Sequence, residues 1–212
     1  MRTHTLALLI ILFAAAAQPA MAADSSWELV KREGAVSLYS RPDPDTKFNA
    51  YKGAALFEAP IETVYAAFLG PEIAQQWMFQ LETIQALPAP SDVERYYMQW
   101  DLPWPIPDGD VVADMSRDFD EANRTWILWF LKQDIEFKGG SGSKRLDGFK
   151  CVWRLSAMGN NQTLVEFGLT IVPGGSFPHW AVNYWNRIFT INNVQELLNF
   201  LSEEKAVTQT PQ

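Results

Sequence analysis

The segment that decides the fold is TIVPGGSFPHWAVNYWNRIFTINNVQELLNFL, residues 170–201. It predicts the end of a strand, a break at Pro173-Gly174-Gly175, and a helix of about seven turns that continues to Leu201. Apolar residues recur in the helix at spacings of three and four, which places them on one face: Ala181, Tyr184, Ile188, Ile191, Val194, Leu198 and Leu201. Polar residues fall on the other face, which suits water: Asn186, Arg187, Asn192, Asn193 and Glu196. Such a helix is either an ordinary C-terminal helix packed on a sheet or the lid of a cavity.

The chain before this helix is predicted to consist mostly of strands. Runs rich in β-branched and aromatic residues, separated by turn residues, predict strands over 27–33, 36–40, 48–57, 81–87, 93–102, 110–119, 125–131, 151–157 and 163–172. Two short helices are expected after the third strand, over 59–69 and 71–79. The glycine-rich segment 138–144 is expected to be a flexible hairpin tip.

Three motifs follow one another along the chain. They are WELV at 27–30 with VSLYSR at 36–41, LPWPIPDGD at 102–110, and PGGSFPHWAVN at 173–183. Together they resemble the START domains, the steroidogenic acute regulatory protein-related lipid-transfer family, over nearly all of the chain after its first two dozen residues. The resemblance implies an α+β helix-grip fold of the Bet v 1-like superfamily: a curved antiparallel sheet wrapped round a long C-terminal helix, with two short helices after the third strand. It also implies a lipid tunnel between sheet and helix.

The residues expected at this tunnel come from several strands and from the helix. Within the strand 93–102, Tyr96, Met98 and Trp100 share one face and should point inward, because the opposite face is polar. We expect eight residues to contact the ligand: Tyr96, Met98, Trp100, Met115, Phe167, Leu169, Tyr184 and Ile188. A gate is expected at the loop 103–107 and the start of the helix, formed by Trp104, Ile106, Phe177 and Trp180.

The chain departs from the family pattern in three places. Gly109 stands where the family usually has an arginine, and Val172 stands where an aspartate often precedes Pro-Gly-Gly. Tyr96 and Met115 occupy positions that carry a buried charge pair in some animal members. A sterol hydroxyl would therefore lack that charged partner here.

Residues Met1–Ala22 are expected to be a signal peptide. Arg2 supplies a positive start, residues 6–17 form an apolar run too short to span a bilayer comfortably, and Ala20-Met21-Ala22 is a cleavage site. Retention of this segment as an uncleaved anchor is the alternative. Its removal leaves about 190 residues, which fits one domain. We expect a lipid-binding domain over 23–204, a disordered tail over 205–212, and an exported protein, periplasmic or secreted.

The chain is acidic, with 17 Lys and Arg against 25 Asp and Glu and a formal net charge of −8. Loss of Arg2 with the signal peptide makes this −9. Such a chain is repelled by nucleic acid and by anionic lipid surfaces, so any membrane contact should be apolar and transient. We expect a monomer whose partner is a hydrophobic small molecule or lipid. The single Cys151 cannot form an internal disulfide, and its apolar neighbours predict a buried, unreactive thiol.

Residues suited to catalysis are scarce. After the predicted signal peptide, His179 is the only histidine and Cys151 the only cysteine, which excludes His-rich or Cys-rich metal clusters and leaves a thiol nucleophile without partners. Two acidic pairs flank strand ends and are expected to be solvated: Asp108 with Asp110, and Asp118 with Asp120. We therefore expect no catalytic residue, metal site or cofactor.

Three functions remain open from the sequence. The leading hypothesis is an exported, non-enzymatic carrier that encloses one sterol-like, acyl or phospholipid ligand. The second is a cyclase-like or hydrolase-like enzyme of the helix-grip superfamily acting on an apolar substrate. It requires a buried titratable group in the tunnel, and the candidates are Tyr96, Arg117, Arg154 and Tyr184. The third is a structural module of the cell envelope with a filled core and no cavity.

Overall fold

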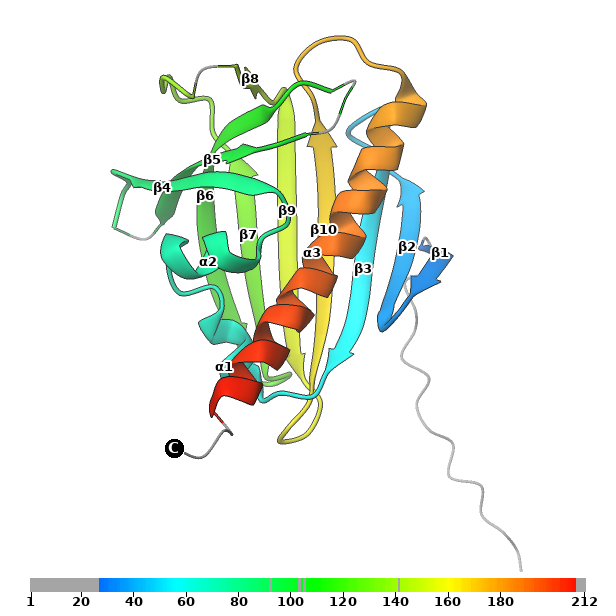
Figure 1. The fold of residues 1–212 in the computed structure, drawn as a ribbon, viewed down its shortest axis with the longest axis vertical. Helices are drawn as coiled ribbons and strands as arrows, with labels where there is room; N and C mark the ends of the chain where they lie inside the picture. The colour runs from blue at the N-terminus through cyan, green and yellow to red at the C-terminus, as the bar shows by residue number, and fades with distance from the viewer. Residues whose placement is uncertain (1–26, 92, 103, 105, 141, 209–212) are drawn as a thin grey trace, which may run out of the picture.

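The computed structural model describes residues 27–91, 93–102, 104, 106–140 and 142–208 (Figure 1). These residues form, in order, β1 (Glu28–Glu33), β2 (Val36–Pro42), β3 (Asn49–Phe57), α1 (Ile61–Ala66), α2 (Pro71–Trp77), β4 (Leu81–Leu87), β5 (Glu94–Trp100), β6 (Gly109–Asp120), β7 (Thr125–Lys132), β8 (Lys144–Arg145), β9 (Gly148–Ala157), β10 (Thr163–Val172) and α3 (His179–Thr208). The predicted signal peptide, residues 1–22, lies outside the described residues. Helix α3 includes the first four residues of the predicted tail, 205–208. None of the described helices has both the length and the apolar character needed to cross a bilayer.

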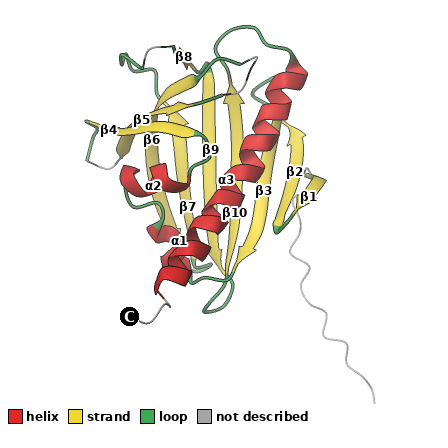
Figure 2. Cartoon of the chain, viewed as in Figure 1, coloured by secondary structure: helices red, strands yellow, loops and turns green. Residues whose placement is uncertain are grey.

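The strands form one open sheet in the order β1-β2-β3-β10-β9-β7-β6-β5-β4, with β8 added in parallel beside β6. All the neighbouring pairs along the main path are antiparallel. The sheet curves around α3, which crosses it diagonally (Figure 1). Figure 2 shows the short helices α1 and α2 beside the C-terminal half of α3. This architecture confirms the predicted α+β helix-grip fold, including the two short helices after the third strand.

The alternation of residues along β10 explains which face of the sheet forms the core. Val165, Phe167 and Leu169 are buried, whereas the alternate residues Glu166 and Gly168 are partly exposed. Side chains of successive strand residues point to opposite faces, so the buried set lines the concave face under α3. The alternate residues, which are partly exposed, lie on the outer face of the sheet.

An aromatic cluster joins the short helices to the sheet. Trp153 of β9 lies opposite Phe167 of β10, and their rings stack with centroids 4.1 Å apart. Trp153 also meets Phe68 and Trp77 edge-on, at 5.2 and 5.4 Å between centroids. Phe68 follows α1 and Trp77 ends α2, so burial of these rings fixes both helices against the sheet.

Helix α3 buries part of the predicted face, and it also buries residues that were expected in water. The buried residues of α3 are Ala181, Val182, Asn186, Phe189, Thr190, Ile191, Asn193, Val194, Leu197 and Leu201. Tyr184 is half exposed, and Ile188 is only partly buried. Asn186 and Asn193, which were expected in water, are 1% and 3% exposed. The prediction was wrong at these positions because hydrogen bonds to other parts of the chain allow the two amides to be buried.

The two buried asparagines attach α3 to the rest of the molecule. The side-chain amide of Asn186 donates to the carbonyl oxygen of Ile171 at 3.0 Å and accepts from its N–H at 2.9 Å. The side chain of Asn193 accepts from the N–H of Phe79 at 3.3 Å and donates to the carbonyl oxygen of Phe189 at 2.9 Å. The helix is therefore bonded to the end of β10 and to the segment after α2.

Replacing Asn186 by alanine should lower the free energy of unfolding by about 2 kcal/mol, because the buried N–H and carbonyl of Ile171 both lose their partner. Urea unfolding of the two proteins measures the change. The matched control is Asn192→Ala on the same helix, where the side chain is partly exposed and the cost should stay below about 0.5 kcal/mol. Equal losses in the two variants would contradict the role given to Asn186.

The connection between β7 and β9, residues 133–147, packs on the outer face of β5 and β6. The Phe137 ring lies 4.8 Å from the Tyr97 ring, and the Gly140 N–H donates to the Tyr97 hydroxyl at 2.8 Å. A Cβ on Gly139 would lie 2.7 Å from a carboxylate oxygen of Asp110, closer than real Cβ contacts. The hairpin is confirmed because β7 and β9 are antiparallel neighbours, but Gly139 packs closely against Tyr97 and Asp110 and does not project freely from the sheet.

Asp110, the second residue of β6, holds this connection in place. It is 4% exposed, and its carboxylate accepts hydrogen bonds from the hydroxyl of Ser143 at 2.6 Å and from the guanidinium of Arg145. Arg145 also donates to the carbonyl oxygens of Ile135 and Phe137, at 3.2 and 3.0 Å. The expectation of a solvated carboxylate is wrong for Asp110, because β8 and the segment before it cover its side chain.

Candidate functional site

Three small cavities lie inside the molecule, two of them under α3 and the third between α2 and the sheet. The first, about 10 Å³, lies where α3 begins and is lined by Ile106, Val182 and Trp185 among others. The second, about 20 Å³, lies under the middle of α3 against Cys151, and the third, about 10 Å³, lies beside α2 against Ala74. Cavities of this size hold about one water molecule each at most.

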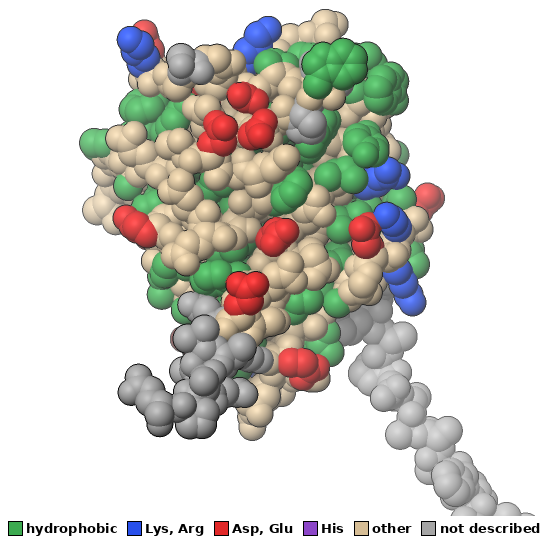
Figure 3. Space-filling view, viewed as in Figure 1, with side chains coloured by type: hydrophobic (Ala, Val, Ile, Leu, Met, Phe, Trp, Pro, Cys, Tyr) green, Lys and Arg blue, Asp and Glu red, His purple; other side chains and the backbone are tan. Residues whose placement is uncertain are grey.

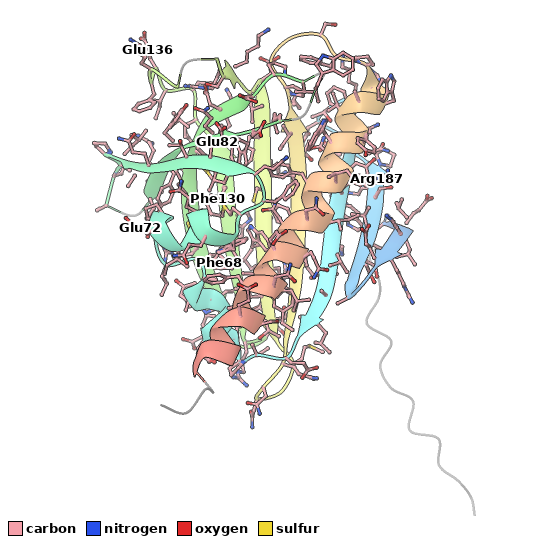
Figure 4. All side chains as sticks on the ribbon, viewed as in Figure 1. Phe68, Glu72, Glu82, Phe130, Glu136 and Arg187 are labelled. Atoms are coloured by element: carbon pink, nitrogen blue, oxygen red, sulfur yellow. The ribbon has the colours of Figure 1, made fainter. Side chains whose placement is uncertain are left out.

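The three cavities share walls and so form a row. Phe189 borders both the first and the second cavity. Met78 and Phe130 border both the second and the third. Figure 4 labels Phe68 and Phe130, two residues of the third cavity, on the α1–α2 side of α3. Three side chains are therefore common to neighbouring cavities along this row, which we call the passage.

Most of the residues predicted to contact a ligand lie along this row. Met98, Trp100, Phe167 and Leu169 line the second cavity, and Tyr96 and Met115 line the third. The structure does not bring the two helix residues to these cavities. Tyr184 is 50% exposed and lies under the Arg187 guanidinium, whose Cζ is 5.3 Å from the ring centroid, and Ile188 is only partly buried. Phe189, Asn186 and Asn193 line cavities in their place, because α3 is rotated from the predicted orientation.

The passage is closed in this structure. Pockets for small molecules usually measure roughly 300–1,000 Å³, far more than these cavities provide. Aromatic rings fill the space: Trp100 packs against Phe149 and Phe189 with centroids 5.4 and 6.1 Å apart. A ligand under α3 would require the helix or these side chains to move.

A polar cluster borders the third cavity. Tyr96 lines the cavity and donates its hydroxyl to the Glu94 carboxylate at 2.6 Å. Arg117 donates to the same carboxylate and to the Tyr65 hydroxyl, the latter at 2.9 Å. Burial raises the pKa of Tyr96 above its ordinary value, and the hydrogen bond to Glu94 raises it further. The phenol therefore stays protonated at neutral pH and acts as a donor.

The Glu94–Arg117 ion pair escaped the sequence analysis. Glu94 lies two residues before Tyr96 on β5, and Arg117 lies two residues after Met115 on β6. Tyr96 and Met115 are the positions where the resemblance locates a charge pair. The signal was present in β5, because Glu94 and Tyr96 are alternate residues and so share a face. Its partner on β6 could be identified only from the strand register, which sets Glu94 opposite Met115.

The four residues considered for catalysis do not form one site. Tyr96 and Arg117 meet at Glu94. Arg154 is exposed on the outer face of β9, and Tyr184 is half exposed on α3. Within the part of the chain that the structure describes, no group of three or more His, Cys, Asp or Glu side chains could hold a metal ion.

The four predicted gate residues divide into two kinds. Ile106 is buried and lines the first cavity, and Phe177 is partly buried against the core. Trp104 and Trp180 are 92% and 68% exposed. Figure 3 shows apolar side chains gathered at the end of the molecule where α3 begins. Trp180 and Tyr184 are four residues apart on α3 and so share a face, and Trp104 lies in the loop that contributes Ile106 to the first cavity. We call these three exposed side chains the exposed aromatic patch.

Cys151 is buried, as predicted, and borders the second cavity. Burial raises the pKa of its thiol, which lowers the fraction of reactive thiolate. We expect iodoacetamide at pH 8 to label the folded protein at least about 100-fold more slowly than the urea-unfolded chain, as followed by intact mass. Similar labelling rates in the two states would contradict a shielded thiol.

No protein-family model matches the chain. A Pseudomonas aeruginosa protein whose function is uncharacterised is 27% identical over 158 residues, which cover 74% of this chain and 77% of that protein.

Three solved structures share the fold, and two of them are named as lipid transfer proteins. A STAR-related lipid transfer protein of Xanthomonas axonopodis is 19% identical, with 84% of this chain and 99% of that chain covered and a TM-score of 0.73. Human STARD10 is 16% identical over 89% of this chain and 78% of its own, with a TM-score of 0.76. Human StAR-related lipid transfer protein 5 is 13% identical over 87% of this chain and 90% of its own, with a TM-score of 0.78.

Proposed function

This chain has the START-like helix-grip fold, and from it we propose that the protein binds one lipid or lipid-like molecule between α3 and the sheet, without catalysing a reaction. The observation that carries the proposal is the row of small apolar cavities in which neighbours share Phe189, Met78 and Phe130 as lining residues. Lipid transfer proteins of the same fold support the class of ligand.

The row also suggests how such a ligand would lie. Its apolar part would replace the side chains that now fill the space under α3, gaining roughly 25 cal/mol for each Å² of apolar surface removed from water. Its polar group would lie at the third cavity, where the Tyr96 hydroxyl and the Glu94–Arg117 pair provide hydrogen-bonding groups. An amphipathic lipid fits this arrangement better than a pure hydrocarbon.

Of the two movements that could admit a ligand, we infer that α3 lifts from the sheet, at least in part. Two of its attachments are the side-chain hydrogen bonds of Asn186 and Asn193. Water can replace hydrogen-bond partners when a helix lifts, so such attachments are weaker barriers than an equally extensive apolar contact. The proposed carrier therefore opens at a membrane to admit its ligand.

A filled interior is also what a structural module without a ligand would have. One experiment separates this function from that of a lipid carrier. Protein produced with its own leader is analysed by native mass spectrometry, and then after incubation with phosphatidylcholine vesicles that contain a fluorescent fatty acid. A carrier should show a bound mass that is released on denaturation, or should take up the fluorescent lipid. Protein that shows no bound mass and takes up no fluorescent lipid would rule out the carrier.

We also propose that the exposed aromatic patch is the membrane contact. Trp104→Ser combined with Trp180→Ser should slow lipid uptake from phosphatidylcholine vesicles at least about tenfold, because interfacial aromatic side chains are lost. The free energy of unfolding should change by less than about 0.5 kcal/mol, since both side chains are exposed.

A matched control uses Met158, which is 49% exposed after β9, in the turn to β10 at the other end of the sheet (Figure 1). Met158→Ser should leave lipid uptake unchanged. Equal slowing by this control and by the tryptophan variant would overturn the assigned contact.

Export with cleavage after Ala22 is the final part of the proposal. A protein whose intact mass begins at Ala23, recovered outside the cytoplasm, is the expected result. A protein that keeps residues 1–22 in the membrane fraction would support the anchor instead.

A further inference from the structure

A groove of about 500 Å³ lies on the face of the sheet opposite α3. Gly168 of β10 lies on its floor, with Lys52 of β3 and Val152 of β9 directly beside it in the sheet register. A Cβ on Gly168 would meet only two backbone oxygens, both 4.0 Å away, so the space above the floor is open. Glycine inside a strand often marks a place where another group approaches the backbone.

Both walls of the groove are held against the sheet by specific contacts. On one side the Trp27 ring lies 4.5 Å from the Arg41 guanidinium and 5.4 Å from the Lys52 ammonium group, measured to the ring centroid. At the other wall, one carboxylate oxygen of Asp43 accepts a hydrogen bond from the Thr170 hydroxyl at 2.8 Å. The other oxygen accepts from the backbone N–H of Asp45 at 2.9 Å. These contacts make the groove preformed, which lowers the entropy cost of binding.

The charges at the groove differ from those of the chain as a whole. Four basic side chains border it, Arg41, Lys52, Lys150 and Arg154, against the acidic Asp43, Asp45 and Glu166. The whole chain has a formal net charge of −8.

Two of the basic residues remain available to a ligand. Glu166 already pairs with Lys52, at 3.0 Å between nitrogen and oxygen. Among the residues that the structure describes, neither Lys150 nor Arg154 has a carboxylate within 4.0 Å. Both are exposed on β9, on either side of Val152 and on the same face.

We propose that this groove binds a small organic anion: a carboxylate or phosphate group carried on a flat apolar body. The anionic group contacts Lys150 and Arg154, and the apolar body packs on Val152 and Trp27. The groove volume lies within the range of roughly 300–1,000 Å³ usual for small-molecule sites. This site is separated from the interior cavities by the sheet itself, so it does not depend on the proposed lipid binding.

The test uses 1-naphthoate and 1-naphthyl phosphate as probes, and 1-naphthalenemethanol as the uncharged control. Each is titrated into the ¹⁵N-labelled protein, and amide chemical shifts are followed by NMR. The two anions should shift the amides of Lys52, Val152 and Gly168, and should bind at least about tenfold more tightly than the alcohol at low salt. Comparison of the two anions distinguishes a carboxylate site from a phosphate site.

Two variants localise the binding. Lys150→Gln with Arg154→Gln should raise the Kd of the anions at least about tenfold, whereas Arg32→Gln with Lys138→Gln, an equal change of net charge at two exposed sites elsewhere, should leave it within about twofold. Gly168→Phe should fill the groove and abolish the shifts. Equal binding of the alcohol, shifts confined to the amides around the interior cavities, or an unchanged Kd in the Lys150/Arg154 variant would each overturn the proposal.

Discussion

Replacing Phe189 by alanine is expected to lower the free energy of unfolding by about 4 kcal/mol and to join two of the interior cavities. Phe189 is 3% exposed, and its ring lies 5.7 Å from that of Phe79 and 6.1 Å from that of Trp100. Truncation removes this apolar contact and leaves a cavity that the rigid sheet cannot close. Urea unfolding measures the loss.

The same variant should take up lipid faster than the unaltered protein, because the ring that borders both the first and the second cavity is gone. Phe189→Trp, which keeps the passage blocked, should not. The stability control is Phe119→Ala on β6, where the side chain is 38% exposed and about 1 kcal/mol is expected. A destabilised Phe189→Ala protein with unchanged lipid uptake would count against a ligand path through the cavity row.

Asp110→Ala is expected to cost about 3 kcal/mol, because Arg145 and Ser143 lose their buried acceptor while the arginine charge remains. The segment 133–147 should detach from the sheet, so amide hydrogen exchange at Gly140, which donates to Tyr97, should speed up. Unfolding experiments and hydrogen exchange measure the two effects.

Asp118→Ala is the matched control for this change. Asp118 lies on the same strand and is exposed, so its removal should alter stability by less than about 0.5 kcal/mol. A similar loss in both variants would show that the effect comes from β6 in general and not from the buried carboxylate of Asp110.

The order of the elements could be predicted from the sequence because it depends on local signals, whereas the helix-grip fold was implied by the resemblance of three motifs to START domains. Alternation placed Tyr96, Met98 and Trp100 on the inner face of β5, and the structure lines cavities with all three. Pro173-Gly174-Gly175 separates β10 from α3 in the structure. Polarity with a period of two, and turn residues at the strand ends, are properties of the chain itself.

The face of α3 that contacts the sheet could be predicted only in part from periodicity. Periodicity treats asparagine as a residue that faces water, yet Asn186 and Asn193 are buried. Their partners, Ile171 and Phe79, lie 15 and 114 residues away along the chain. A buried amide is stable only when such partners are in place, so the rotation of the helix depends on tertiary hydrogen bonds.

The sequence by itself therefore determined the strands, the long helix and an apolar interior, because these follow from local propensity and from the spacing of apolar residues. Only the tertiary structure decided that Phe189, Met78 and Phe130 each line two neighbouring interior cavities, that Glu94 joins Arg117, and that Asp110 is buried under residues 133–147. Each of these depends on which side chains from distant segments occupy the same space. Packing and hydrogen bonding between distant segments are set by the register of the sheet and not by any local pattern.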